Sequence, residues 1–209
     1  MSKETAEHFI KNVVKTYQEA RELAFPDIHN KVKRGRNHTV ASKIEDLLAI
    51  TIQTKLNRHH TFKVDQPLSI EGKTFYPDIV VIRKGQVVHL LDLKMDLGWN
   101  RNGFTDFCKK ADARNIKHQG KIAVLKNGRT KIPGELKIAP DCKHHVVVVS
   151  STNISKEKFE KHIAATNKLK STKVYTLSHE VHPNTYRKPI SDIIIDTNAF
   201  NSLIRNLKQ

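Results

Sequence analysis

Apolar residues recur at helical spacing in the first part of the chain. Phe9, Val13 and Tyr17 lie four positions apart, and Ile44 and Leu48 repeat this spacing. Such a pattern places apolar side chains on one face of a helix. Together with three later segments, the predicted helices are residues 3–23, 39–57, 104–118, 155–169 and 197–207.

Short apolar runs separated by turn residues predict strands. Residues 61–70, 74–83 and 87–95 are separated by EGK and KGQ, so we expect an antiparallel meander. Asn127-Gly128 between apolar residues indicates a further hairpin. The run HHVVVVSS at residues 144–151 has the continuous β-branched character of a strand buried on both faces.

The last part of the chain continues with a helix and a second strand, KVYTL, at residues 173–177. A strand, a helix and another strand predict a parallel crossover. No internal repeat or linker divides the sequence, so we expect residues 1–209 to form a single domain. The predicted fold class is α/β (α+β), with a mixed central β-sheet flanked by helices.

Asp78, Asp92 and Lys94 are the side chains with the clearest chemical meaning. Asp92 and Lys94 lie two positions apart in the run LLDLK, so both project from one face of a strand. If a three-residue loop at residues 84–86 joins the two strands, Asp78 lies opposite Asp92, whereas a two-residue loop shifts the pairing by one. Two carboxylates on adjacent strands favour a bound cation, and hard oxygen ligands favour Mg²⁺, with Mn²⁺ as a substitute. Lys94 would then position or deprotonate an attacking water.

Glu45 is a third candidate metal ligand, because it borders the apolar stripe of the helix predicted at residues 39–57. The segment from Ser42 to Glu45 also matches a capping box, in which the glutamate bonds the start of the helix. An earlier helix start, with Thr39 as the cap, would leave Glu45 available to a metal. Both interpretations are open from the sequence.

The net charge of +16 and the isoelectric point of about 9.9 favour a polyanionic partner, most simply nucleic acid. No basic amphipathic helix indicates a membrane surface instead. Candidate phosphate contacts lie in the loop at residues 29–38, in the helix at 104–118, which could also be an ordinary solvated face, and at the tip of the Asn127-Gly128 hairpin. These residues are Lys31, Lys33, Arg34, Arg36, Lys109, Lys110, Arg114, Lys117, Lys126, Arg129 and Lys131.

Other features narrow the class of protein. No apolar stretch is long enough to span a bilayer and no signal-peptide core is present, so we expect a cytoplasmic protein. Cys108 and Cys142 lack the spacing of a disulfide framework or a zinc site, and we expect buried, reduced thiols. The histidine pairs at residues 59–60 and 144–145 cannot chelate one ion from a regular strand, because adjacent side chains face opposite ways. His89 is expected to pack in the core.

The stretch PDIVVIRKGQVVHLLDLK, residues 77–94, resembles the signature of the PD-(D/E)XK nucleases. In that signature a Pro-Asp is followed, on the next strand, by an acid, one residue and a lysine. The matching residues are Pro77, Asp78, Asp92, Leu93 and Lys94. The resemblance implies a restriction-endonuclease-like αβββαβ core, here about residues 39–151, with two metal-binding acids and a catalytic lysine. In many members an N-terminal helix adds another acid, and Glu45 matches it by order.

The size of the chain and its lack of ATPase motifs most resemble a Type II restriction endonuclease. This resemblance implies an Mg²⁺-dependent endonuclease that cuts double-stranded DNA as a homodimer, with no small-molecule cofactor beyond the metal. A structure-specific repair or junction-resolving nuclease is an alternative with the same site. A non-catalytic, basic nucleic-acid-binding protein with structural acids is the alternative from another class.

Overall fold

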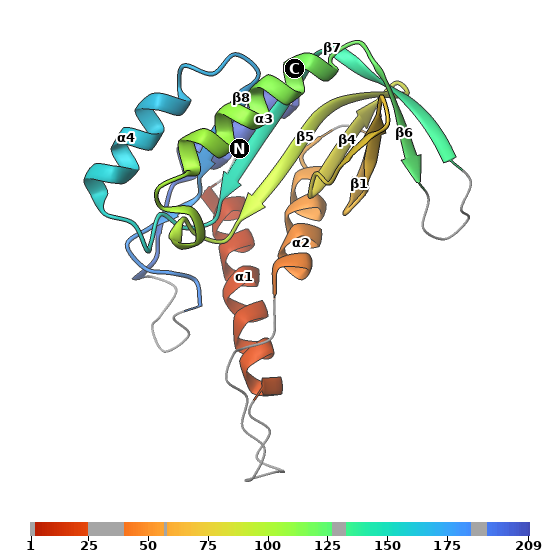
Figure 1. Ribbon diagram of the computed structural model, residues 1–209. Coiled ribbons are helices and arrows are strands. Elements are labelled where there is room, and N and C mark those ends of the chain that lie inside the picture. The colour runs from red at the N-terminus through yellow and green to blue at the C-terminus, as the bar shows by residue number, and fades with distance from the viewer. Residues whose placement is uncertain (1–2, 25–39, 57, 127–132, 185–191) are drawn as a thin grey trace.

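The computed structural model describes residues 3–24, 40–56, 58–126, 133–184 and 192–209. They form a mixed β-sheet with helices on both faces (Figure 1). The five α-helices of these ranges are α1 (Lys3–Ala24), α2 (Ala41–Gln53), α3 (Phe104–His118), α4 (Lys156–Thr166) and α5 (Thr197–Leu207). None of them combines the length and the apolar character needed to cross a membrane.

The main sheet has the strand order β1-β4-β5-β7-β6-β2-β3, and β8 also pairs with β7. Its strands are β1 (His60–Val64), β2 (Leu68–Ile70), β3 (Lys73–Phe75), β4 (Ile79–Arg83), β5 (Gln86–Lys94), β6 (Ile122–Lys126), β7 (Pro133–Val148) and β8 (Thr172–Thr176). A second sheet pairs β9 (Ser178–His179) with β10 (Ile194–Ile195). The predicted class, a mixed sheet flanked by helices, is therefore confirmed.

The 16-residue strand β7 organises the sheet, because one of its edges serves two partners. Residues 133–137 pair with β6 in antiparallel fashion, and residues 144–148 pair with β8 in parallel. The other edge pairs in parallel with β5 on both sides of an irregularity near Pro140. A proline is tolerated at such an irregularity because no ladder hydrogen bond is lost there.

Side chains on the two faces of β7 enter different cores. Val147, together with Val149 just beyond the strand, belongs to the larger core with α1, α2 and α5, whereas Val146 and Val148 pack with Phe104 of α3. Adjacent residues of a strand point to opposite faces, so these strand positions are buried on both sides. The predicted two-sided burial of this segment is confirmed.

The antiparallel hairpin of β4 and β5 is present as predicted, but the simple three-stranded meander is wrong. The segments expected as single strands at residues 61–70 and 74–83 are each divided in two. Asp65, with φ of 48°, ends β1, and Pro77 separates β3 from β4. As a result β1 pairs with β4, while β2 and β3 form a hairpin at the opposite edge of the sheet.

Both turn signals mark two-residue hairpins. Arg83 pairs with Gln86 across Lys84-Gly85, and the β2–β3 hairpin turns at Glu71-Gly72. All four turn residues have positive φ, as the turns that suit strand twist require, and glycine adopts this conformation without steric cost.

The predicted helices are largely confirmed. α3 and α5 have the expected bounds, and α4 begins after Ser155, whose hydroxyl accepts a hydrogen bond from the Lys158 backbone N–H. α2 is shorter than residues 39–57, because it begins at Ala41 and ends at Gln53. The parallel crossover from β7 through α4 to β8 is also present. The turn expected at Asn127-Gly128 lies outside the described residues, although β6 and β7 pair as a hairpin would.

A chain of polar side chains is buried between the sheet and α5. His89 Nδ1 lies 3.1 Å from His145 Nε2, and His145 Nδ1 lies 3.2 Å from the Tyr175 hydroxyl. Asn206 of α5 donates a hydrogen bond of 2.8 Å to that hydroxyl. Donation from Asn206 through Tyr175 and His145 to His89 gives each of these contacts one donor and one acceptor with both imidazoles neutral, and it leaves the buried His89 Nε2 without a hydrogen-bond partner among the described residues. Burial lowers the pKa of His89 from 6.5 to about 4 and lowers the pKa of His145 as well.

We therefore expect acid to destabilise the protein through this chain. Below pH 6.5, His89 is protonated in the unfolded state but stays neutral in the folded state, whose pKa for this group is about 4. The free energy of unfolding therefore falls as the pH decreases from 6.5 towards about 4. In urea unfolding across this range, the wild type should lose about 1.4 kcal/mol more per pH unit than His89→Asn. His8→Gln, at an exposed position of α1, is the control. Parallel pH profiles for the wild type and His89→Asn would contradict the expectation.

Candidate active site

Lys94 lies between the two acids singled out in the sequence. Its Nζ is 3.6 Å from Asp78 Oδ2 and 3.9 Å from Asp92 Oδ1. The side chains of Lys94 and Asp78 are about one-fifth exposed, and Asp92 is buried. The ring of Phe107, on α3, lies 5.5 Å from Lys94 Nζ. The structure thus brings all three residues together beneath α3.

The register of the β4–β5 hairpin accounts for this convergence. Ile79 pairs with Leu91, so Asp78 precedes β4 at the position opposite Asp92. The loop between β4 and β5 has two residues, Lys84 and Gly85. By itself, this loop would shift the pairing of β4 with β5 by one residue and move Asp78 away from the position opposite Asp92. A β-bulge at Val88 restores the register expected for a three-residue loop. Asp78 Oδ2 also accepts a hydrogen bond of 2.6 Å from the Leu93 backbone N–H, which fixes the carboxylate against β5.

Asp92 is held by a histidine of the neighbouring strand. His144 Nε2 donates to Asp92 Oδ2 over 2.9 Å, and Thr172 of β8 lies 3.4 Å from His144 Nδ1. Adjacent His145 points to the opposite face and contacts His89, as the alternation of a strand requires. The two histidines are therefore not joint ligands of one ion.

Burial and neighbouring charges act differently on the two aspartates. Burial raises the pKa of Asp78, and this outweighs the lowering by Lys94 and by the Leu93 N–H. Burial also raises the pKa of Asp92, but the hydrogen bond and charge of His144, with Lys94 and Arg114, bring it below its usual value. Asp92 is thus held as an anion, while Asp78 binds a proton more readily.

Glu45 lies close enough to Asp78 and Lys94 to interact with them electrostatically. Burial raises its pKa, and the charges of Asp78 and Asp65 raise it further. The capping-box interpretation is wrong, because Val40 is the N-cap of α2 and makes no side-chain cap hydrogen bond. Glu45 lies in the second turn of α2 and is half-buried.

The basic residues expected to bind phosphate are described in part. Lys109, Lys110 and Lys117 are exposed on α3. Arg114 is half-buried, with its guanidinium carbon 5.0 Å from the centre of the Phe75 ring, and its charge lowers the pKa of Asp92. The remaining side chains lie outside the described residues: Lys31, Lys33, Arg34, Arg36, Lys126, Arg129 and Lys131.

Cys108 and Cys142 are free and buried, as expected. Burial raises the pKa of each thiol to about 12. A thiol with such a pKa is a poor nucleophile at neutral pH, so neither cysteine is suited to catalysis.

The donor atoms at this site fit a hard divalent cation bound in part by the protein. Across the described ranges, no group of three or more histidine, cysteine, aspartate or glutamate side chains is arranged to hold a metal ion. Mg²⁺, however, keeps several waters and takes one or two carboxylates together with substrate phosphates. Asp78 and Asp92 supply that number of carboxylates.

Sequence reasoning missed His144 as a member of this site. Its strand was expected to be buried, but nothing in the sequence indicates that β7 pairs with β5 in the register that aligns it with Asp92. The even spacing of His144, Val146 and Val148 was the available signal, because it defines one face of β7. An imidazole on that otherwise apolar face needs a polar partner.

No protein-family model matches the chain, and no curated protein or solved structure matches it either.

The Asp92–His144 hydrogen bond should be measurable in the stability of the protein. His144→Leu leaves a buried carboxylate without this donor, so we expect the free energy of unfolding to fall by about 1–3 kcal/mol. A double-mutant cycle with Asp92→Ala, measured by urea unfolding, should give a coupling energy of at least about 0.5 kcal/mol. Additive effects of the two substitutions would show that the contact contributes nothing.

Proposed function

We propose that this protein is an Mg²⁺-dependent endonuclease that hydrolyses phosphodiester bonds in double-stranded DNA. The observation that carries the proposal is the convergence of Asp78, Asp92 and Lys94 at the ends of two paired strands. Burying three ionised groups together is unfavourable unless they form ion pairs with one another or bind a ligand. With Glu45 nearby, the carboxylates outnumber the ammonium group, in a chain whose net charge is +16. A local negative site in a basic protein suits a cation and a polyanionic substrate together.

The order of elements supports the narrower proposal of a PD-(D/E)XK core. Helix α2, the antiparallel strands β1, β4 and β5, helix α3 and the parallel strand β7 occur in the order of an αβββαβ unit, with β2 and β3 inserted between β1 and β4 and with β6 inserted between α3 and β7. The β2–β3 hairpin lies between β1 and β4 in sequence and pairs at the opposite edge of the sheet. It therefore leaves the hairpin with the two acids unchanged.

Each residue of the site has a role that follows from its contacts. Asp78 and Asp92 would hold the metal, which when bound neutralises phosphate oxygens and lowers the pKa of a coordinated water. His144 and the Leu93 N–H orient the two carboxylates. Lys94 presents a compact ammonium with three donors to the phosphate or the attacking water. The centre of the Phe107 ring lies 5.5 Å from Lys94 Nζ, within the range of a cation–π contact.

Charge on α3 supplies phosphate contacts next to this site. Lys109, Lys110 and Lys117 are exposed, and Phe107 of the same helix touches Lys94. Contacts to phosphates position a protein on DNA without reading its sequence. Within this proposal, the narrower form is a Type II restriction endonuclease that acts as a homodimer, because a single site of this kind cuts one strand.

Plasmid DNA incubated with the protein and Mg²⁺ tests the proposal. We expect nicking and linearisation that EDTA abolishes, and a loss of at least about a hundredfold in rate for Asp92→Ala and Lys94→Ala. Asp141→Ala and Lys168→Ala replace exposed residues outside the site and should cleave as the wild type does. Discrete fragments from phage DNA would favour a restriction enzyme. DNA that stays intact with Mg²⁺ and with Mn²⁺ would favour a binding protein with structural acids and would refute the proposal.

Glu45 and its neighbour Asp46 provide a matched pair of variants. Glu45 interacts with Asp78, whereas Asp46 is exposed on the same turn of α2. If Glu45 contributes to the metal site, Glu45→Gln should raise the Mg²⁺ concentration needed for half-maximal cleavage by about tenfold. Asp46→Asn should leave that concentration unchanged. If both variants need the same Mg²⁺ concentration for half-maximal cleavage, Glu45 does not contribute to the metal site.

A further inference from the structure

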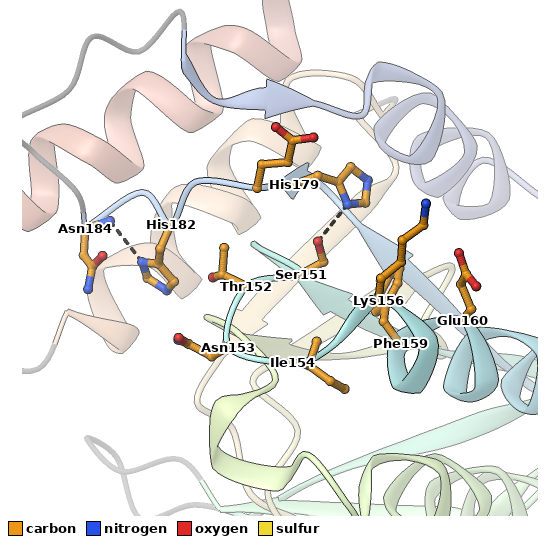
Figure 2. Close-up of a pocket in the computed structure, with 11 residues that line it drawn as sticks. Ser151, Thr152, Asn153, Ile154, Lys156, Phe159, Glu160, His179, His182 and Asn184 are labelled. Carbon is orange, nitrogen blue, oxygen red and sulfur yellow. Dashed lines mark hydrogen bonds between the residues drawn. The ribbon is translucent and has the colours of Figure 1, made fainter.

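A pocket of about 820 Å³ opens at the carboxyl ends of β7 and β8 (Figure 2). Seven residues of the segment 151–160 line one wall, and four residues of the segment 179–184 line the other. We call it the strand-end pocket. Asp78, Asp92 and Lys94, which form the candidate active site, do not line this pocket. Its volume falls in the range of pockets that take small organic ligands, about 300–1,000 Å³.

The strand-end pocket and the candidate active site share one edge of the sheet. β5, β7 and β8 are parallel, and Lys94, Val148 and Thr176 end them at the same level. The Val149 N–H donates to the Lys94 carbonyl, and the Leu177 N–H donates to the Val148 carbonyl. In open sheets, ligands bind in crevices outside the carboxyl ends of parallel strands.

Asp96 connects the pocket directly to the strand that carries Lys94. Its Oδ2 accepts a hydrogen bond of 2.8 Å from Asn153 Nδ2 and lies 3.3 Å from His182 Nε2. Asn153 and His182 belong to opposite walls of the pocket. One carboxylate, two residues beyond Lys94, thus holds both walls in position.

The lining favours a flat, neutral ligand. Phe159 and His179 present rings at 72° to each other, with centroids 6.2 Å apart, and Ile154 adds an apolar side chain. Lys156 is accompanied by two carboxylates, Glu160 and Glu180, so the pocket has no excess of positive charge to attract a phosphate. Hydroxyl and amide groups complete the lining, and such groups can pair with the edge of a heterocycle.

Both walls also contain backbone in a conformation that side chains disfavour. Asn153 has φ of 66° and Glu180 has φ of 65°. The Val181 N–H donates to the His179 carbonyl over 2.7 Å, which makes Glu180 the centre of a three-residue turn. Turns of this kind with positive φ are rare and strained, and strain of this kind concentrates at ligand sites.

We propose that the strand-end pocket binds a nucleobase. This inference rests on the proposed nuclease function, because the bases are the flat, neutral parts of the polyanion expected at Lys94. A base enters such a pocket when it is unpaired, and it is held by stacking on aromatic side chains and by hydrogen bonds to its edge. The ligand can therefore be an unpaired nucleotide of the DNA or a free nucleotide.

Fluorescence of 2-aminopurine, an adenine analogue, tests the pocket in the absence of divalent metal. The full-length protein is titrated into a short duplex with one unpaired 2-aminopurine, into the same duplex with that base paired, and into 2-aminopurine deoxyriboside. Binding of dAMP is measured by its competition with the deoxyriboside. We expect saturable binding of the deoxyriboside. Tighter binding of the unpaired than of the paired duplex identifies DNA as the source of the base. Equal binding of the two duplexes, with saturable binding of dAMP, identifies a free nucleotide.

Two variants connect this signal to the pocket. Thr152→Tyr fills the pocket and should weaken binding by about tenfold, whereas Thr61→Tyr, at an exposed position of β1, should not. Asn184→Ala removes a lining side chain but keeps the bond from its backbone N–H to His182 Nδ1, so it serves if Thr152→Tyr fails to fold.

Absence of saturable binding to the deoxyriboside, to dAMP and to the unpaired duplex would overturn the inference. Binding that Asn184→Ala and a folded Thr152→Tyr leave unchanged would overturn it as well. Because no metal is present, neither result bears on cleavage. A protein that binds the base and leaves plasmid DNA intact in Mg²⁺ would instead contradict the nuclease proposal alone.

Discussion

The parallel pairing of β5 with β7 is the constraint on which the candidate site depends. It aligns Asp92 with Val146 and so brings the His144 imidazole to the Asp92 carboxylate. The same pairing fixes the level at which β5 ends and therefore where Lys94 emerges from the sheet. On its other edge β7 carries β8, whose end forms part of the strand-end pocket. One strand thus determines the relative positions of two sites.

Within this frame the two aspartates differ because their hydrogen-bond partners differ. Each is removed from water, which by itself favours the protonated acid. Asp92 receives a side-chain donor and feels several positive charges, and it remains ionised. Asp78 has one backbone donor and the partly solvated Lys94, which do not offset its burial. Two chemically identical groups are thereby given different affinities for a proton, which suits the metal-dependent hydrolysis proposed above.

The sequence predicted the local parts of this arrangement well. Helices α3 and α5 and the positions of both turns follow from short-range patterns of residues. The facing of Asp78 and Asp92 was expected for a three-residue loop, whereas the observed loop has two residues. The β-bulge at Val88 could not be predicted, because it depends on how β5 fits between β4 and β7. This bulge compensates for the two-residue loop, so that Asp78 lies opposite Asp92.

Contacts between distant segments were the part that the sequence did not reveal. Separating β2 and β3 from the meander requires knowing that β6 offers them an edge. His144 is recognised as a partner of Asp92 only when the β5–β7 register is known. Glu45 is the intermediate case: its helix was predicted, but excluding the cap interpretation required the observed start of α2 at Ala41.

The Asp92–His144 hydrogen bond joins residues 52 positions apart in the chain. Contacts of such long range form late, because the entropy of closing a long loop must be overcome before the contact stabilises anything. A chain in which only the β4–β5 hairpin has formed would hold both aspartates and the lysine but lack the donor that fixes Asp92. The orientation of that carboxylate is therefore a property of the completed fold, and a partly folded chain does not possess it.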